Sequence, residues 1–206
     1  MGNSKPGDLQ DPRTTAPEPP QPDLPVPLNG RNYCGELNIR IDRSGKWFYN
    51  GSPIARKVMV SLFASLLMRA KDGAYWLVSP TEMGRIHVED APFVITHMST
   101  KNEGEDQIIQ FSTNVDIAVT VSEDNPILMK PNPLTGELTP YVVMPGNIDA
   151  RIERAIYYDL VELGAVMDLG DEEIFGVWSC CSFFPLGSIH GAEQDAEQDT
   201  GQDTGA

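Results

Sequence analysis

The chain has 206 residues and a formal net charge of −15 at pH 7, with 30 Asp and Glu against 15 Lys and Arg. Binding to DNA or RNA needs a basic face that releases counterions, so this balance argues against a nucleic acid as the partner, and the same electrostatics disfavour an anionic membrane surface. No hydrophobic run approaches the roughly 20 residues needed to cross a bilayer, and we expect a soluble, cytoplasmic protein.

Two low-complexity segments flank the part of the chain that can build a core. Residues 1–30 hold eight of the 17 prolines, a composition that favours extended polyproline conformations. Within residues 191–206, an Ala-Glu-Gln-Asp unit occurs twice in succession, at 192–199. We therefore predict a disordered arm at 1–30, a disordered acidic tail at 191–206, and between them one domain or two small ones.

The first predicted elements are a hairpin and a helix. Apolar and polar side chains alternate over residues 36–41, as in a strand with one buried face, and a turn leads into a second strand at 46–49. Ser52 is a suitable N-cap and Pro53 suits the first helical position, so we expect a helix from there to about Arg69. Its apolar surface is broad, which predicts cover from its own sheet and from a neighbouring domain.

A meander of strands and a second helix follow along the chain. Asn147 or Asp149 is expected to cap this helix and Gly164 to end it. An aromatic strand then closes the folded part. The predicted strands lie at residues 74–78, 85–89, 93–99, 107–113, 115–121, 138–143 and 175–184.

Four blocks of sequence, at residues 45–56, 88–94, 150–160 and 175–187, resemble the proteobacterial domain-of-unknown-function family DUF1285 in content and order. Four ordered blocks are harder to match by chance than any single motif. The resemblance covers roughly residues 31–190. It implies two related α+β domains, the second similar to a pleckstrin-homology barrel, with a ligand site where the domains meet, and it brings no established activity.

We therefore predict an α+β fold of two small related domains, each an antiparallel sheet packed with one helix. The first is expected over residues 31–80, and the second, a pleckstrin-homology-like meander plus helix, over residues 81–190. An internal repeat of strands, a helix with an early Arg and an aromatic strand is consistent with this duplication.

The common catalytic and metal-binding patterns are missing from the sequence. His87, His97 and His190 lack the close spacing of metal ligands. No phosphate-binding loop, dinucleotide fingerprint or hydrolase elbow is present. We expect no metal and no cofactor, and the sequence offers no support for an enzyme.

The cysteines Cys34, Cys180 and Cys181 cannot all pair, and a disulfide between the two neighbours would be strained. In their strand-like surroundings Cys180 and Cys181 are predicted to be small buried residues, with a redox-sensing thiol as the alternative. They also depart from the family, in which these positions are usually small and often glycine.

A ligand site is indicated by Arg56 and Lys57, which fall in the first turn of the predicted helix, where the positive end of the dipole disfavours cations. A carboxylate, with Glu89 and Asp90 as the candidates, or an anionic ligand should therefore lie nearby. Arg151 is likewise a cation near the beginning of the second predicted helix. The candidate ligand-binding residues are Arg56, Glu89, Asp90, Arg151, Trp178 and Ser179.

Three functions remain open from the sequence. The leading hypothesis is a non-catalytic ligand-binding module for signal transduction, with a small anionic ligand in an interdomain cleft; its nucleotide-like and signalling aspects come from the resemblance. The alternative is a protein-interaction module without a small ligand. The third is an enzyme that uses Glu89 and Asp90 as acid and base, which would require two facing carboxylates with one raised pKa.

Overall fold

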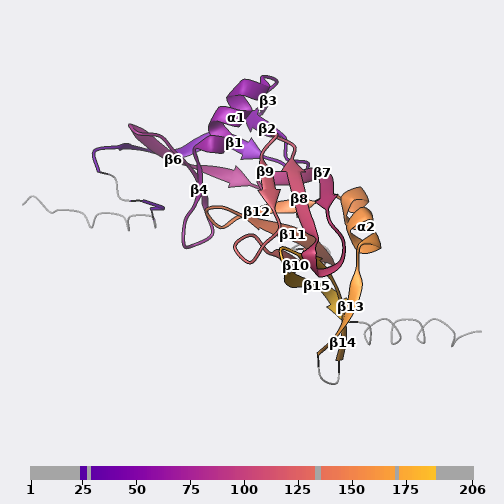
Figure 1. Ribbon diagram of the computed structural model, residues 1–206. Coiled ribbons are helices and arrows are strands. Elements are labelled where there is room, and N and C mark those ends of the chain that lie inside the picture. Colours follow the sequence, from indigo (N-terminus) through magenta and orange to yellow (C-terminus); the bar gives the residue numbers. More distant parts are fainter. Residues whose placement is uncertain (1–23, 27–28, 133–135, 170–171, 189–206) are drawn as a thin grey trace, which may run out of the picture.

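The computed structural model describes residues 24–26, 29–132, 136–169 and 172–188, and Figure 1 shows two curled sheets with a smaller third sheet at one end. Strands dominate, and the part of the chain that is described has two α-helices, one in each domain. The expected combination of a sheet and a helix in each domain is confirmed, although the protein is mostly β.

The first domain is a six-stranded sheet in the order β3-β2-β1-β6-β5-β4. Its central strands β1 and β6 are parallel, and its other neighbours are antiparallel. The elements are β1 (Asn32–Ile41), β2 (Trp47–Tyr49), β3 (Ser52–Pro53), α1 (Lys57–Ser65), β4 (Leu67–Arg69), β5 (Tyr75–Val78) and β6 (Glu82–Val88).

The second domain repeats this arrangement in the order β10-β11-β12-β7-β8-β9, again with one central parallel pair, β7 and β12. Helix α2 and a three-stranded antiparallel sheet, β13-β14-β15, follow. The elements are β7 (Phe93–Lys101), η1 (Gly104–Asp106), β8 (Ile108–Thr113), β9 (Ala118–Thr120), β10 (Ile127–Pro131), β11 (Leu138–Met144), β12 (Ile148–Ile152), α2 (Arg154–Glu162), β13 (Ala165–Leu169), β14 (Glu172–Ser179) and β15 (Ser182–Ser188).

The two large sheets share one topology. Each sheet consists of two three-stranded meanders. They meet at the centre of the sheet, where the first strand of one meander lies parallel to the last strand of the other. The helix occupies different places, because α1 connects the two meanders of the first sheet whereas α2 follows the second sheet. The duplicated two-domain architecture is thus visible in strand order. Both sheets depart from the antiparallel pattern predicted for them.

Several predicted boundaries were wrong. Strand β6 belongs to the first sheet, so the division between the domains lies after Val88 and not at residue 80. Residues 52–53 pair with β2 as β3, which delays α1 to Lys57, and residues 67–69 pair with β5 as β4. Residues 148–152 form the central strand β12, so α2 begins only at Arg154. In each case pairing with a neighbouring strand outweighed the local helix signal.

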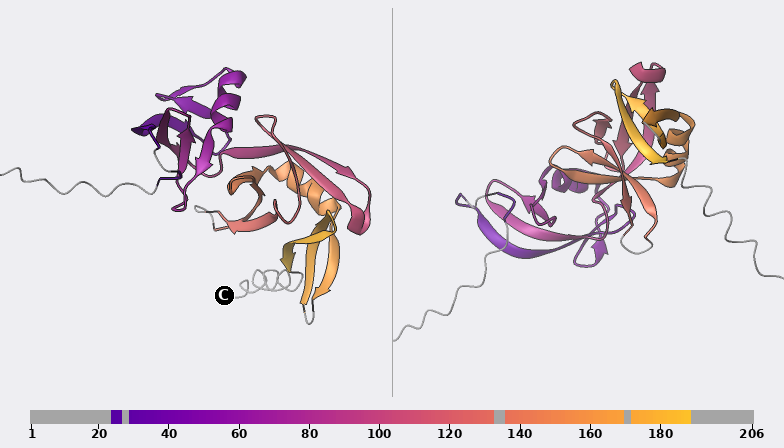
Figure 2. Two further views of the ribbon diagram at one scale, coloured as in Figure 1. Left: turned by 60° about the vertical axis from the view of Figure 1, so that its left-hand side comes forward. Right: turned by 90° about the horizontal axis from the view of Figure 1, so that it is seen from below.

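One hydrophobic core extends through both domains. It joins Ile41 and Trp47 of the first sheet to Ile95 and Phe111 of the second and reaches Phe184 of β15. Figure 2 shows the two domains side by side with the third sheet beyond the second domain. Because apolar contacts cross the junction, the relative position of the domains is fixed by packing as well as by the covalent connection.

A second, smaller cluster of Ala70, Trp76 and Met83 lies in the first domain, and Leu24 and Val26 pack against it. The disordered arm predicted over residues 1–30 was therefore too long, because these two apolar side chains pack against the smaller cluster. Residues 1–23 of the arm and the predicted tail at 191–206 lie outside the described residues.

Cys180 and Cys181 are exposed, contrary to the prediction that they are buried. Ser179 pairs with Ser182, so the two cysteines form the two-residue loop between β14 and β15, with φ angles of 51° and 62°. A loop with positive φ at both central residues is the type I′ turn that matches the twist of a hairpin. The aromatic strand predicted over residues 175–184 is therefore two antiparallel strands, β14 and β15, joined by this turn.

No helix among the described residues is long and apolar enough to span a membrane.

Candidate ligand-binding cleft at the domain junction

The turn between β1 and β2 forms one edge of the junction, and Asp42 holds it in shape. The Asp42 carboxylate accepts hydrogen bonds from the Ser44 hydroxyl at 2.7 Å and from the N–H groups of Ser44 at 2.8 Å and Lys46 at 3.0 Å. Burial acts against its charge, but these hydrogen bonds and the nearby Arg40 outweigh that effect and lower the pKa of Asp42.

Asn114, in the turn after β8, ties this edge to the second domain. Its side-chain NH₂ donates to the Gly45 carbonyl at 2.9 Å, and its side-chain oxygen accepts from the Val94 N–H at 3.1 Å. Gly45 has φ +75°, and a Cβ there would lie 2.5 Å from Asn114 Nδ2. The close approach of the two domains therefore requires a glycine at this position.

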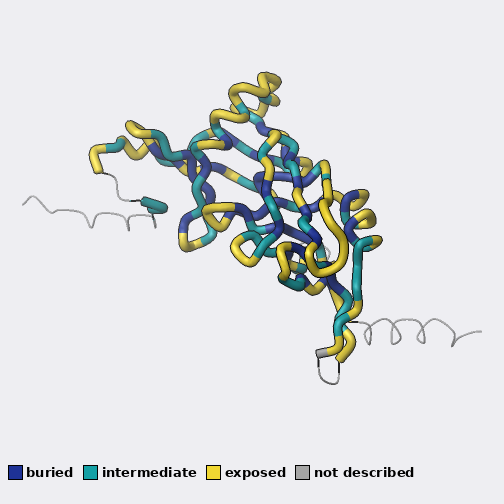
Figure 3. The backbone as a smooth tube through the Cα atoms, in the orientation of Figure 1, coloured by how far each residue is buried: buried dark blue, intermediate teal, exposed yellow. Residues whose placement is uncertain are grey.

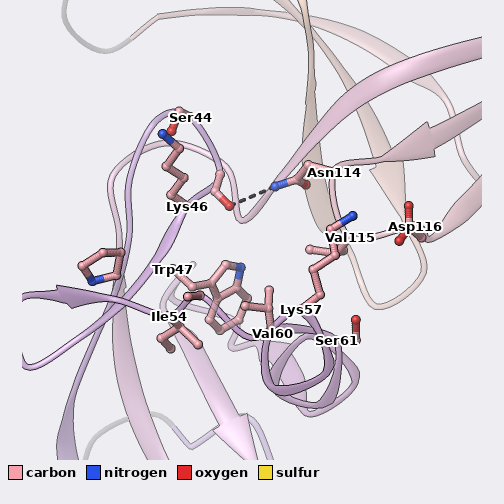
Figure 4. Close-up of a pocket in the computed structure, with 13 residues that line it drawn as sticks. Ser44, Lys46, Trp47, Ile54, Lys57, Val60, Ser61, Asn114, Val115 and Asp116 are labelled. Atoms are coloured by element: carbon pink, nitrogen blue, oxygen red, sulfur yellow. Dashed lines mark hydrogen bonds between the residues drawn. The ribbon is translucent and has the colours of Figure 1, made fainter.

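Beside this contact lies a cleft of about 400 Å³ between the domains (Figure 4). This volume is within the usual range for small-molecule sites, and the walls are largely apolar. The first domain supplies the β1–β2 turn and the beginning of α1, and the second supplies the turn after β8. The lining residues are Ser44, Gly45, Lys46, Trp47, Pro53, Ile54, Ala55, Lys57, Val60, Ser61, Asn114, Val115 and Asp116.

The charges around the cleft favour an anion. Lys46, Lys57 and Asp116 are the charged side chains of the lining, so its net charge is +1. Neither lysine has a side-chain hydrogen bond or ion pair with any residue the structure describes. In Figure 4, Lys57 extends from α1 toward Val115. The first turn of α1 contains no acidic residue and its N-cap makes no side-chain hydrogen bond, so the positive end of the helix is also uncompensated.

Trp47 forms the apolar side of the cleft next to α1. Its ring stacks on Phe63 at a centroid distance of 6.3 Å, and the residue is only 2% exposed. The indole N–H has no hydrogen-bond partner within the described structure. Leaving such a donor unsatisfied costs about 1–3 kcal/mol, so an acceptor that reached it would bind with that advantage.

Asp90 and Arg151 meet at the domain junction, outside the cleft. Arg151 Nε lies 3.3 Å from Asp90 Oδ2, and Arg151 Nη2 donates to the Arg43 carbonyl at 3.0 Å. The Tyr141 hydroxyl donates to Asp90 Oδ1 at 2.6 Å. Burial and this contact with Asp90 raise the pKa of Tyr141. The group joins the β1–β2 turn of the first domain to β11 and β12 of the second.

Asp149 forms a second junction contact. It pairs with Arg69 of the first domain at 3.0 Å and with Lys130 of its own domain at 2.7 Å, and its side chain is 11% exposed. Tyr75 lies beside this pair, and burial raises the pKa of Tyr75 to about 12, with Arg69 opposing and Asp149 adding to the shift. Because this carboxylate is largely removed from water, the loss of its cations would be strongly destabilising, and the contact helps to hold the two domains together.

None of the six predicted site residues lines the cleft. Arg56 is exposed and has no side-chain partner among the described residues, so its expected pairing with Glu89 or Asp90 was wrong. Glu89 instead pairs with Arg40 and accepts from the Arg43 N–H at 3.3 Å. Glu89 and Asp90 are thus held by different arginines and do not face one another as an acid–base pair.

Trp178 and Ser179 lie on β14, in the far part of the second domain. Ser179 is fully buried, accepts from the Ile109 N–H at 3.0 Å and donates to the Val121 carbonyl at 2.7 Å. The Trp178 carbonyl accepts from the Gln107 side chain at 2.9 Å. These contacts tie the third sheet to the second domain, which is a structural role.

The cleft residues that sequence reasoning missed are mainly Gly45, Trp47 and Asn114. The first two lie in one of the four family blocks, and the turn at Gly45 was predicted. Asn114 has no local signal, since its role depends on two backbone groups 20 and 69 residues away along the chain. Within the described residues, no group of three or more His, Cys, Asp or Glu side chains could hold a metal ion.

The chain belongs to the DUF1285 family. Residues 25–91 match the family's N-terminal domain, a domain of unknown function, and residues 92–186 match the C-terminal domain of this protein of unknown function. The division after residue 91 agrees with the place of β6 in the first sheet. No curated protein matches the chain.

Two crystal structures of family members are similar to the chain. The DUF1285 family protein from Silicibacter pomeroyi DSS-3 is 40% identical, with a TM-score of 0.71 over 82% of this chain and 91% of that one. The DUF1285 family protein from Shewanella baltica OS155 is 26% identical, with a TM-score of 0.50 over 61% of this chain and 91% of that one.

Proposed function

We propose that the protein is a non-catalytic ligand-binding module and that its interdomain cleft takes a small anionic ligand. The observation that carries the proposal is the lining of net charge +1, in which neither the lysines nor the positive end of α1 has a carboxylate partner among the described residues. An anion would be attracted by both, while Ile54, Val60 and Val115 would pack against an apolar or planar part of the ligand.

The position of the cleft supports the proposal of a signalling role. Because its walls come from both domains, a bound ligand would contact the β1–β2 turn and the turn after β8 at once. A ligand that contacts both turns would stabilise the relative position of the domains seen here, because it would bind less tightly to any arrangement in which the two turns lie farther apart. A nucleotide-like ligand is the finer form of the proposal, since a planar base suits the apolar walls and a phosphate suits Lys57 and the helix N-terminus.

The proposal is tested by a thermal-shift panel of cyclic and linear mononucleotides, sugar phosphates and small carboxylates. A ligand present at 100 times its Kd adds about 2.7 kcal/mol of stability, which raises the Tm by roughly 5–10 °C for a chain of this size. Lys57→Glu reverses a charge of the lining and is expected to abolish the shift. Lys71→Glu, at an exposed lysine outside the cleft, is the matched control and should retain it.

Two results would contradict the proposal. One is a panel in which no anion changes the Tm. The other is a ligand whose shift survives in Lys57→Glu, because that ligand would bind elsewhere. A shift from carboxylates but not from nucleotides would keep the anion-binding function and reject its nucleotide-like form.

A further inference from the structure

The outer face of α1 is unusual because its large apolar side chains point into solvent. Val58 is 83% exposed, Leu62 56% and Met59 41%. Val58 and Leu62 lie one turn apart on the same side of the helix, with Met59 next to Leu62. A surface helix normally presents polar residues there. The sequence predicted cover on this side, yet Figure 3 shows the backbone of α1 at the edge of the molecule with much of its length exposed.

The charges of α1 are also placed unfavourably for an isolated molecule. Arg56 is the N-cap and Lys57 the first helical residue, while the last turn contains no basic residue. Both cations therefore lie at the positive end of the helix dipole, and the negative end is uncompensated. Neither side chain has a partner among the described residues that would offset this arrangement.

A second copy of the same helix, packed antiparallel, would correct both features. Antiparallel packing places Arg56 of each helix over the last turn of the other, where the last carbonyl groups carry the negative end of the dipole. It also brings Val58 of each helix against Leu62 of the other across a two-fold axis, the usual symmetry of a self-complementary patch. An acidic partner would satisfy the cations but leave the C-terminal end of the helix uncompensated.

We propose that the outer face of α1, formed by Arg56, Val58, Met59 and Leu62, is a self-association surface that pairs antiparallel with the same face of a second copy. Three apolar side chains from each copy form a contact smaller than the roughly 1,200–2,000 Å² of a stable complex, so the dimer should be weak and reversible. This face lies outside the cleft, which Lys57, Val60 and Ser61 line from α1.

Sedimentation equilibrium of the full chain tests this proposal over protein concentrations from a few micromolar to about one millimolar. The weight-average mass is expected to rise from 22.6 kDa toward twice that value. Leu62→Asp should weaken association at least tenfold, because a buried charge would enter the contact twice. Val166→Asp is the matched control: Val166 is 53% exposed on β13 and lies outside α1, so this change should leave association unaltered.

A pair of charge variants tests the antiparallel arrangement itself. Arg56→Glu places an acid at the positive end of its own helix dipole, so the variant should still fold. In the dimer, however, each new acid would lie at the negative end of the partner helix, so association should weaken. Adding Ser65→Lys at the exposed end of α1 puts a cation opposite each new acid and should restore association. A parallel pair would bring residue 56 against its own copy and would show no rescue.

The proposal is overturned by a wild-type chain that stays monomeric throughout this range. It is equally overturned by a dimer that Leu62→Asp leaves intact, since the contact would then lie elsewhere on the molecule. A dimer that Leu62→Asp disrupts but that the Arg56→Glu, Ser65→Lys pair does not rescue would contradict the antiparallel geometry.

Discussion

A single glycine sets how closely the β1–β2 turn approaches the second domain. Gly45→Ala would place a Cβ 2.5 Å from Asn114 Nδ2 and 3.0 Å from Val94 Cγ2, at a residue whose φ of +75° is itself unfavourable for alanine. We expect the variant to lose about 2–4 kcal/mol of unfolding free energy, from backbone strain and the displaced Asn114 hydrogen bond together. Urea denaturation measures the loss.

Gly51 offers the matched control for this prediction. Its φ is +78°, and a Cβ there would meet nothing within 4 Å. Gly51→Ala should therefore lose only about 1–2 kcal/mol, the cost of the left-handed conformation alone. Equal losses in the two variants would mean that the contact between Gly45 and Asn114 contributes nothing to stability.

Tyr75 should make the protein sensitive to alkaline pH. Burial raises its pKa to about 12, above the value of about 10 for an unfolded tyrosine. The contribution of this raised pKa is therefore fully present below pH 10 and is lost as the pH rises from about 10 to about 12. Across this interval, unfolding free energies from urea titrations should fall less steeply in Tyr75→Phe than in wild type. Tyr49→Phe, at a tyrosine that is 55% exposed, should follow wild type.

At the level of single elements, the β14–β15 hairpin is built from residues that its turn does not favour. A type I′ loop prefers Asn-Gly, whereas Cys180 and Cys181 each adopt the left-handed conformation at a cost of about 1–2 kcal/mol. Replacing the pair by Asn-Gly should therefore raise the unfolding free energy by about 1–3 kcal/mol in thermal or urea denaturation. Cys34→Ser, at an exposed cysteine in β1 without positive φ, should change it little. A destabilised Asn-Gly variant would show that the thiols make contacts of their own.

The same elements show what could be predicted from the sequence. The alternation of apolar and polar side chains in β1 and the turn at Gly45 predicted the first hairpin, because both signals are local in the sequence. The helix at 52–69 was predicted too long at both ends, because Ser52, Pro53 and residues 67–69 are used in strand pairs that local propensity does not reveal.

Prediction of the candidate site was limited by the same cause. Lys57 was recognised as an unfavourably placed cation, and it does line the cleft. The partner of a charged side chain, however, depends on tertiary structure: Asp90 was a predicted partner of Arg56 but pairs with Arg151 instead. Asn114 could not be found at all, since both of its partners are backbone atoms of distant segments.

For the whole molecule, the shared core and the charged junction predict that the two domains unfold together. Trp47 and Trp76 are buried in the first domain and Trp178 lies on β14, so their three indole N–H signals in an NMR spectrum of ¹⁵N-labelled protein report on separate parts of the fold. All three should lose intensity at the same urea concentration, as in a two-state transition.

Asp149→Ala tests how far the junction contributes to that cooperativity. The substitution removes the largely buried carboxylate that pairs with Arg69 and Lys130, so the free energy of unfolding should fall by on the order of 3 kcal/mol. Asp149 belongs to the second domain and bonds to Arg69 of the first, so its loss should destabilise both domains. The urea concentration at which each of the three indole signals has lost half its intensity should therefore fall by the same amount. Asp124→Ala, at an exposed acid, is the control and should leave them in place. Should the Trp178 signal survive after those of Trp47 and Trp76 have disappeared, in wild type or in Asp149→Ala, the domains would be separate folding units despite their common core.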